Sequence, residues 1–192
     1  MTYHIGCVVM AAGNAERFAA NKLAAQFEGK SLISRALDAV PKEADTVVVT
    51  QYPDIEILAK AHGFKTVRNE HPDWGISHTI SLGIETLKDC DAILFMVSDQ
   101  PLLKASSVQA VIDRWKKEPD CIVGLSHNGK RGNPNIFPKE FYGELLELRE
   151  DHGGNTVIRR HEDRLRLVEA QKPELTDVDT RTALRDLENQ TT

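Results

Sequence analysis

Two cations follow a short loop of small residues near the start of the chain. Arg17 and Lys22 come after the loop Ala11–Gly13, which directly follows an apolar run from Ile5 to Met10. Small side chains allow backbone N–H groups to approach a ligand closely and to bind phosphate oxygens. The stretch predicts an anion site at the carboxyl end of a strand, where open α/β sheets bind their ligands. A strand-to-helix turn with two solvated cations is the alternative.

Two other phosphate-binding loops do not fit this stretch. A dinucleotide-binding loop needs three spaced glycines, and only Gly13 is present. Gly29–Ser31 resembles the end of a P-loop, but Ala24 occupies the position of that motif's first glycine. We therefore interpret Gly29 as a turn residue and Ser31 as the N-cap of a helix.

Aspartates follow apolar or extended segments at two further places. Asp99 comes just after the most apolar run of the chain, 92–97, and an aspartate at a strand tip is well placed to hold Mg²⁺ beside a phosphate. Asp177 and Asp179 would point the same way on an extended chain. Ordinary helix capping or turn formation is the alternative at both places.

The order of the remaining elements predicts the fold. Apolar runs at 5–10, 47–49, 64–67, 92–97, 121–125 and 164–169 are typical of strands, the last with Leu165, Leu167 and Val168 inward. Helical patterns are expected from residue 31, at 53–62, around 80–87, at 105–117 and 139–148, and after residue 181, while Asn128–Gly129 suits a hairpin. This alternation predicts a single-domain Rossmann-like α/β protein over residues 1–192, a three-layer sandwich with a mostly parallel sheet.

Composition limits the partners that the protein can have. The chain has 192 residues and a net charge of −5, so it lacks the broad basic surface of a nucleic-acid-binding protein. Cys7, Cys90 and Cys121 have no metal-binding spacing and are expected to be buried thiols. The longest apolar run is far too short to cross a bilayer. We expect a cytoplasmic protein that binds neither nucleic acid nor a membrane.

The run VVMAAGNAERFAANKL, from Val8 to Leu23, resembles the signature loop of the MobA-like nucleotidyltransferases. It is most similar to the molybdenum cofactor cytidylyltransferase branch, whose pattern is roughly LAAG-x-S-x-R-[MF]-G-x-x-K. Arg17 and Lys22 fall on the Arg and Lys of the family. Ala19 stands where the family usually has Gly.

Three further motifs extend the resemblance to the nucleotide and the metal. The sequence GISHT resembles the family's G-[ML]-S-x-S, which implies that Gly75, Ser77 and Thr79 help to bind the nucleotide; from the residues alone, helix capping is an equal alternative. MVSDQPLL resembles the D-x-P motif, whose aspartate, here Asp99, binds the metal. DVDT resembles D-[IV]-D-T, whose second aspartate, here Asp179, is the other metal ligand.

The resemblance also suggests where a second substrate, the acceptor, binds. GNPNIFP is similar to the family's G-[HN]-P-x-x-[FL]-P, which borders the acceptor side of the cleft. Residues 150–155 lie where the family has G-D-x-G-A-R, with Glu150 for Gly, Gly154 for Ala and Asn155 for Arg. The acceptor-binding residues expected on this basis are Gln100, Pro101, Lys130, Arg131, Asn133, Pro134 and Asp151; Lys130 and Arg131 could equally be plain surface charges.

The chemistry implied by the resemblance is nucleotidyl transfer. Mg²⁺ and Lys22 would neutralise charge at the α-phosphate, while Arg17 and loop N–H groups, including those of Ala11, Ala12 and Gly13, would hold the outer phosphates. Arg17, Lys22 and Asp99 are thus the expected catalytic residues. No Ser–His–Asp or Cys–His arrangement is evident, and none of the seven histidines is assigned a role.

Ala12 bears on the choice of base. The cytidylyl branch has A-A-G here, whereas the guanylyl branch tends to have a second Gly. The expected function is therefore Mg²⁺-dependent transfer from CTP to the molybdenum cofactor, a phosphorylated pterin, with a molybdoenzyme as a recipient of the product. A guanylyl- or sugar-phosphate nucleotidyltransferase, or a non-catalytic nucleotide- and cofactor-binding chaperone, is the alternative.

Overall fold

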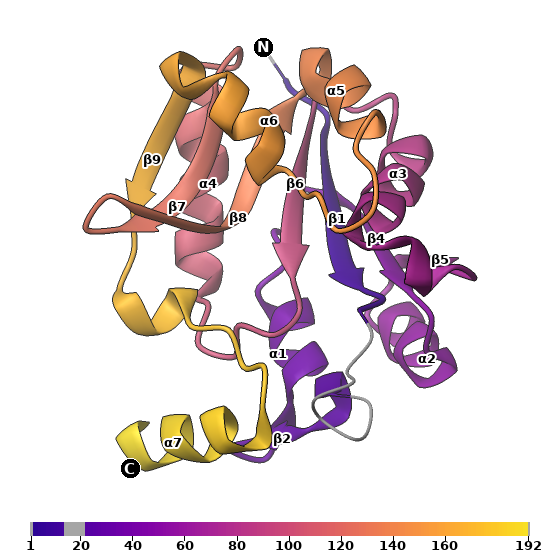
Figure 1. Ribbon diagram of the computed structural model, residues 1–192, viewed down its shortest axis with the longest axis vertical. Coiled ribbons are helices and arrows are strands. Elements are labelled where there is room, and N and C mark those ends of the chain that lie inside the picture. Colours follow the sequence, from indigo (N-terminus) through magenta and orange to yellow (C-terminus); the bar gives the residue numbers. More distant parts are fainter. Residues whose placement is uncertain (1, 14–21, 192) are drawn as a thin grey trace.

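The centre of the molecule is a seven-stranded sheet with the order β5-β4-β1-β6-β8-β7-β9, seen in a computed structural model that describes residues 2–13 and 22–191 (Figure 1). All strands run in one direction except β8, which is antiparallel to both β6 and β7. The strands are β1 (Ile5–Ala11), β4 (Asp45–Thr50), β5 (Lys65–Arg68), β6 (Ala92–Val97), β7 (Ile122–His127), β8 (Lys130–Pro138) and β9 (Leu165–Glu169).

Helices cover both faces of this sheet. The helices are α1 (Leu32–Asp38), α2 (Pro53–Ala61), α3 (Ile76–Thr86), α4 (Ala105–Lys117), α5 (Tyr142–Leu146), α6 (Asn155–Arg160) and α7 (Arg181–Thr191). Short 3-10 turns lie at Lys22–Ala24, Pro72–Trp74, Lys139–Phe141, Glu162–Arg164 and Lys172–Leu175. One core joins α1, α2 and α4 to the sheet, and a second joins α3, α5 and α6 to its other face. The three-layer, mostly parallel α/β fold is confirmed.

The two cores explain why β1 is apolar almost throughout. Cys7 and Val9 face the core beneath α1, α2 and α4, whereas Val8 faces the core beneath α3, and all three are fully buried. A strand between two helical layers has no polar face, so its sequence shows a continuous apolar run rather than alternation.

Several local predictions are confirmed. Ser31 caps α1, its Oγ accepting a hydrogen bond from the Ser34 N–H at 3.2 Å. Asn128 and Gly129 join β7 to β8 with positive φ angles of 50° and 76°, as a tight hairpin turn requires. The three cysteines are free and buried. Burial raises the pKa of Cys7 to about 12, so its thiol stays protonated.

Two expectations near the end of the chain are wrong in part. Leu167 does not face inward, because its side chain is 39% exposed, while Leu165 and Val168 pack on the cores of opposite faces. β9 is an edge strand of the sheet and pairs with one neighbouring strand only, so its side chains are less completely buried than those of the central strands. The helix expected over 139–148 is a 3-10 turn followed by a five-residue α5 that ends at Leu146.

A third apolar cluster attaches the C-terminal segment to the small β2–β3 hairpin. Strands β2 (Gln26–Phe27) and β3 (Lys30–Ser31) precede α1, and the cluster contains Phe27, Leu32, Val178, Leu184 and Leu187. Figure 1 shows β1 and β6 pointing towards the end of the molecule where β2 and α7 lie. Residues before α7 are thereby brought to the carboxyl ends of the central strands.

No helix in the described part of the chain combines the length and the apolar character that a bilayer span requires.

Candidate active site

Lys22, Asp99 and Asp179 meet beside the carboxyl ends of β1 and β6. The Lys22 Nζ lies 2.9 Å from Asp99 Oδ2 and 3.1 Å from Asp179 Oδ1. Each residue comes from a different segment: the 3-10 turn Lys22–Ala24, the loop after β6 and the loop before α7. The Val178 N–H donates to the Asp99 carbonyl at 2.9 Å, which aligns the last two segments. The structure thus brings together three residues that the sequence singled out.

The charges in this cluster keep Lys22 protonated. Burial alone would lower the pKa of Lys22, but the charges of Asp99 and Asp179 and their hydrogen bonds outweigh burial and raise it above its usual value. The Lys22 and Asp99 side chains are only 16% and 20% exposed, whereas Asp179 is 62% exposed. Two carboxylates therefore share one ammonium group, and one negative charge is left over.

The donor set fits a magnesium ion that shares its ligands with a nucleotide. Asp99 Oδ1 is buried and accepts no hydrogen bond from the described residues, so it is a carboxylate oxygen with a free coordination position. Mg²⁺ commonly binds one or two carboxylates together with substrate phosphates rather than a complete protein cage. The described residues contain no cluster of three or more His, Cys, Asp or Glu side chains suited to a metal.

Three consecutive side chains at the end of β4 hold the end of β1 and the loop that follows it. Thr50 Oγ1 donates to the Ala11 carbonyl at 2.8 Å, Gln51 Nε2 donates to the Ala12 carbonyl at 2.8 Å, and the Tyr52 hydroxyl donates to the Gly13 carbonyl at 3.0 Å. In a trans peptide the C=O and N–H groups point in opposite directions. The carbonyls are thus directed to Thr50–Tyr52, and the Ala12 and Gly13 N–H groups to the other side.

The positions of Thr50, Gln51 and Tyr52 in the fold make them part of the site, although the sequence analysis did not identify them. Thr50 is the last residue of β4, the parallel neighbour of β1, and Gln51 and Tyr52 follow it, so all three lie at the same edge of the sheet as the loop. Arg17, the other predicted cation, lies outside the described residues, and its role stays a prediction.

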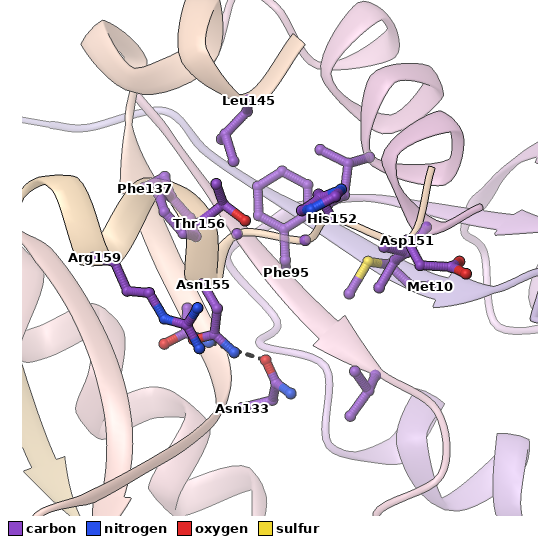
Figure 2. A pocket seen from close by; sticks show the side chains of 16 residues that line it. Met10, Phe95, Asn133, Phe137, Leu145, Asp151, His152, Asn155, Thr156 and Arg159 are labelled. Atoms are coloured by element: carbon purple, nitrogen blue, oxygen red, sulfur yellow. Dashed lines mark hydrogen bonds between the residues drawn. The ribbon is translucent and has the colours of Figure 1, made fainter. Parts of the chain in front are cut away.

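A pocket of about 370 Å³ lies between α3, β8 and α6 and reaches the ends of β1 and β6 (Figure 2). Its apolar wall comes from both central strands and from β8. Polar side chains from β8, α6 and the loop before α6 surround it. Its lining residues include Met10, Phe95, Val97 and Phe137 among the apolar side chains, and Asn133, Asp151, His152, Asn155, Thr156 and Arg159 among the polar ones.

Of the predicted acceptor residues, two line this pocket, and the other five, including Gln100, do not. Asn133 and Asp151 line this pocket. Gln100 is buried and donates to Asp177 Oδ1 at 2.9 Å. Pro101 and Pro134 are also buried away from the pocket lining. Lys130 is exposed on the β7–β8 hairpin, and Arg131 Nη1 lies 3.7 Å from Glu162 Oε1.

The nucleotide-binding residues predicted at the start of α3, Gly75, Ser77 and Thr79, do not line the pocket. Thr79 is buried, and its Oγ1 accepts a hydrogen bond from Asn69 Nδ2 at 3.1 Å. Ser77 lines a separate groove that also contains Trp74. The Ser77 N–H donates to the Glu150 carbonyl at 3.1 Å. Gly75 packs directly on the backbone of Glu150. Their binding roles stay predictions. In this structure Gly75 and Ser77 contact Glu150 and so join the start of α3 to the loop 150–154, called the pocket loop below, whereas Thr79 is bonded to Asn69.

At three positions of residues 150–155 the sequence departs from the family pattern, and the structure shows the surroundings of each. Glu150 has a φ of +52°, a conformation that favours the glycine usual in the family. Gly154 lies against Phe137, and a Cβ atom there would be 2.8 Å from Phe137 Cζ. Asn155 lines the pocket, and so does Arg159, one turn further along α6.

The family profile of the MobA-like NTP transferase domain matches residues 7–165 of the sequence. The chain belongs to this family. As a MobA-like protein it is a nucleotidyltransferase, and the matched range includes the loop after β1, Lys22, Asp99 and the whole pocket. Asp179 lies beyond the matched range.

Solved structures with the same fold cover nearly the whole MobA-like chain. Rv0371c from Mycobacterium tuberculosis H37Rv is 20% identical with a TM-score of 0.81, over 98% of this chain and 100% of that one. Its manganese complex aligns with a TM-score of 0.79. The nucleotidyl transferase Mth528 from Methanothermobacter thermautotroptrophicus is 22% identical with a TM-score of 0.81, over 98% and 99% of the two chains.

A CTP complex is also among the similar structures. CMP:2-keto-3-deoxy-manno-octonic acid synthetase with bound CTP is 14% identical with a TM-score of 0.75, over 98% of both chains. A comparison with curated protein sequences finds no match.

Proposed function

We propose that this nucleotidyltransferase transfers CMP from CTP to the phosphate of the molybdenum cofactor, a phosphorylated pterin, with Mg²⁺ as its metal. The acceptor phosphate oxygen would form a bond to the α-phosphorus of CTP, and the bond to the β-phosphate would break to release pyrophosphate. The observation that carries the proposal is the convergence of Lys22, Asp99 and Asp179 beside the loop after β1.

Each residue of the cluster has a role that follows from its charge. Asp99 and Asp179 would hold the divalent ion, which when bound supplies positive charge to the phosphates. The Lys22 ammonium lies at the same place and would bind an α-phosphate oxygen, while the directed N–H groups of Ala12 and Gly13 would bind further phosphate oxygens. An acceptor phosphate is already anionic, so catalysis rests on positioning and charge rather than on a strong base.

The choice of CTP rests on Ala12. Ala12 is 3% exposed and belongs to the loop after β1, where the guanylyl branch of the family tends to have a glycine. A methyl group in a tight pocket is worth about 1–3 kcal/mol of discrimination. The CTP complex of the octonic acid synthetase shows that a protein with this fold binds CTP, which agrees with the proposal.

A guanylyl- or sugar-phosphate nucleotidyltransferase is the second candidate. It is favoured by residues 150–155, where Asn155 replaces the arginine usual in the family and Glu150 replaces a glycine. These changes alter the acceptor side of the site and leave Lys22 and Asp99 in place.

Calorimetric titration with CTP, GTP and ATP, each with and without Mg²⁺, tests the nucleotide and the metal. We expect Mg²⁺-dependent binding of CTP that falls at least tenfold in Asp99→Asn and is kept in Asp113→Asn, a matched change on the exposed side of α4. Stronger binding of GTP or ATP would contradict the Ala12 argument, and unchanged CTP binding in Asp99→Asn would contradict the metal assignment. Formation of the cytosine dinucleotide with release of pyrophosphate then tests the acceptor.

A further inference from the structure

Arg159 has no acidic partner among the described residues, in contrast to the next three arginines of the sequence. Arg160 lies 3.3 Å from Glu144, and Arg164 and Arg166 lie 2.6 Å and 2.7 Å from Glu140 and Glu118. Arg159 instead lines the pocket between α3, β8 and α6. A guanidinium group offers several N–H donors in a planar fork that suits carboxylate and phosphate oxygens. The Arg159 side chain is therefore available to bind an anion in this pocket.

A second donor lies at the same end of the pocket. Asn133 Oδ1 accepts a hydrogen bond from Asn135 Nδ2 at 2.9 Å, so the Asn133 Nδ2 group is left to donate to a ligand. Figure 2 shows Arg159 and Asn133 at one end of the pocket and Asp151 at the other. One end of the pocket thus holds hydrogen-bond donors, and the other end holds the Asp151 carboxylate, which can accept hydrogen bonds.

The wall between these two ends is apolar and partly aromatic. Phe95 and Phe137 lie edge to face with ring centroids 5.9 Å apart, and Met10 and Val97 continue the wall to the strand ends. A flat ring system could pack on this wall while its substituents reach the two polar ends. A simple sugar would leave much of the apolar wall without contacts.

We propose that Arg159 is the residue that binds the phosphate group of the proposed acceptor, whose flat heterocycle would lie along the apolar wall of the pocket. The phosphate would accept hydrogen bonds from Arg159 and Asn133, the heterocycle would pack on Phe95 and Met10, and its N–H groups would donate to Asp151. The proposal rests on the proposed function for the acceptor, and it adds the residue that binds the acceptor's phosphate.

The test compares a phosphorylated ligand with its alcohol. Pterin-6-ylmethyl phosphate and 6-hydroxymethylpterin are each titrated calorimetrically into the protein after its nucleotide site is filled with Mg²⁺ and α,β-methylene-CTP, or with the analogue of whichever nucleotide binds. We expect the phosphate to bind about tenfold more tightly than the alcohol, as a charge-assisted hydrogen bond implies. This preference should disappear in Arg159→Gln and persist in the matched control Arg160→Gln. Nucleotide affinity should be equal in all three proteins.

The outcomes separate this inference from the proposed function. A phosphate preference that survives in Arg159→Gln overturns the inference, and so does a wild-type protein with no phosphate preference for any probe. Ribose 5-phosphate and ribose form a second pair of probes. An Arg159-dependent preference seen only with the ribose pair would support Arg159 as the anion-binding residue but would refute the heterocycle and, with it, the pterin acceptor.

Discussion

Adding a single methyl group at Gly75 should lower the free energy of unfolding substantially. Its φ of +83° and ψ of −177° lie in a region that is essentially restricted to glycine. A Cβ atom at this position would lie 2.3 Å from both the carbonyl carbon and the oxygen of Glu150, and 2.8 Å from the Asp151 nitrogen. Because these atoms belong to the backbone, no side-chain rotation can relieve the overlap.

The expected cost of Gly75→Ala has two parts. The conformation alone costs about 1–3 kcal/mol, and the overlap requires the pocket loop to move away from α3, which breaks the Ser77–Glu150 hydrogen bond, worth about 0.5–1.5 kcal/mol. The free energy of unfolding should therefore fall by about 3 kcal/mol. Gly63 is the matched control, since its φ is +80° but a Cβ atom there meets nothing within 4 Å. Gly63→Ala should cost only about 1–2 kcal/mol.

Urea unfolding measures this difference. With an m-value of about 2 kcal/mol/M, Gly75→Ala should lower the midpoint by about 1.5 M and Gly63→Ala by about half as much. Affinity for the phosphorylated pterin should also fall in Gly75→Ala only, because the displaced loop carries Asp151. The reasoning is refuted if the two variants have equal midpoints and equal affinities.

Three further predictions concern the loop, the cluster and the edge strand. Tyr52→Phe removes the hydrogen bond to the Gly13 carbonyl, so calorimetry should show a loss of CTP affinity of about three- to tenfold, and unchanged affinity would remove Tyr52 from the site. Lys22→Met leaves two carboxylates without their ammonium partner, so thermal melting should show a destabilised protein whose melting temperature rises more on addition of Mg²⁺ than that of the wild type; an equal rise would contradict this. Hydrogen bonds from Arg114 and Arg166 lower the pKa of Glu118 from 4.5 to about 2. They stabilise the fold above about pH 4 and are lost as the pH falls towards 2. Urea midpoints should therefore fall less between pH 5 and pH 3 in Glu118→Gln than in the wild type, and parallel curves would contradict this.

The central elements could be predicted because their sequences leave little choice. β6 lies between two helical layers, and its apolar run coincides with the strand, 92–97. α4 shows a regular apolar face and also has the expected bounds, 105–117. Leu167 shows the limit of such patterns, because alternation indicates which residues share a face and not whether a helix covers that face.

The site was predictable only where a motif marked it. Asp99 and Asp179 are 80 residues apart, and it is the packing of α7 on β2–β3 that brings the second one to Lys22. No pattern singles out Gln51 and Tyr52, since polar residues after a strand usually belong to a turn. Arg159 resembles any solvated charge on a short helix until the pocket beside it is known.

The shared use of Lys22 has a consequence for how ligands enter the site. Its ammonium group acts as an internal counter-ion for Asp99 and Asp179. A divalent cation that neutralises these carboxylates frees the ammonium for a phosphate, and a phosphate that attracts the ammonium leaves the carboxylates free for the cation. Each ligand should then raise the affinity of the other by the same factor, because such coupling is reciprocal. The site would thus select the metal–nucleotide complex over either component alone.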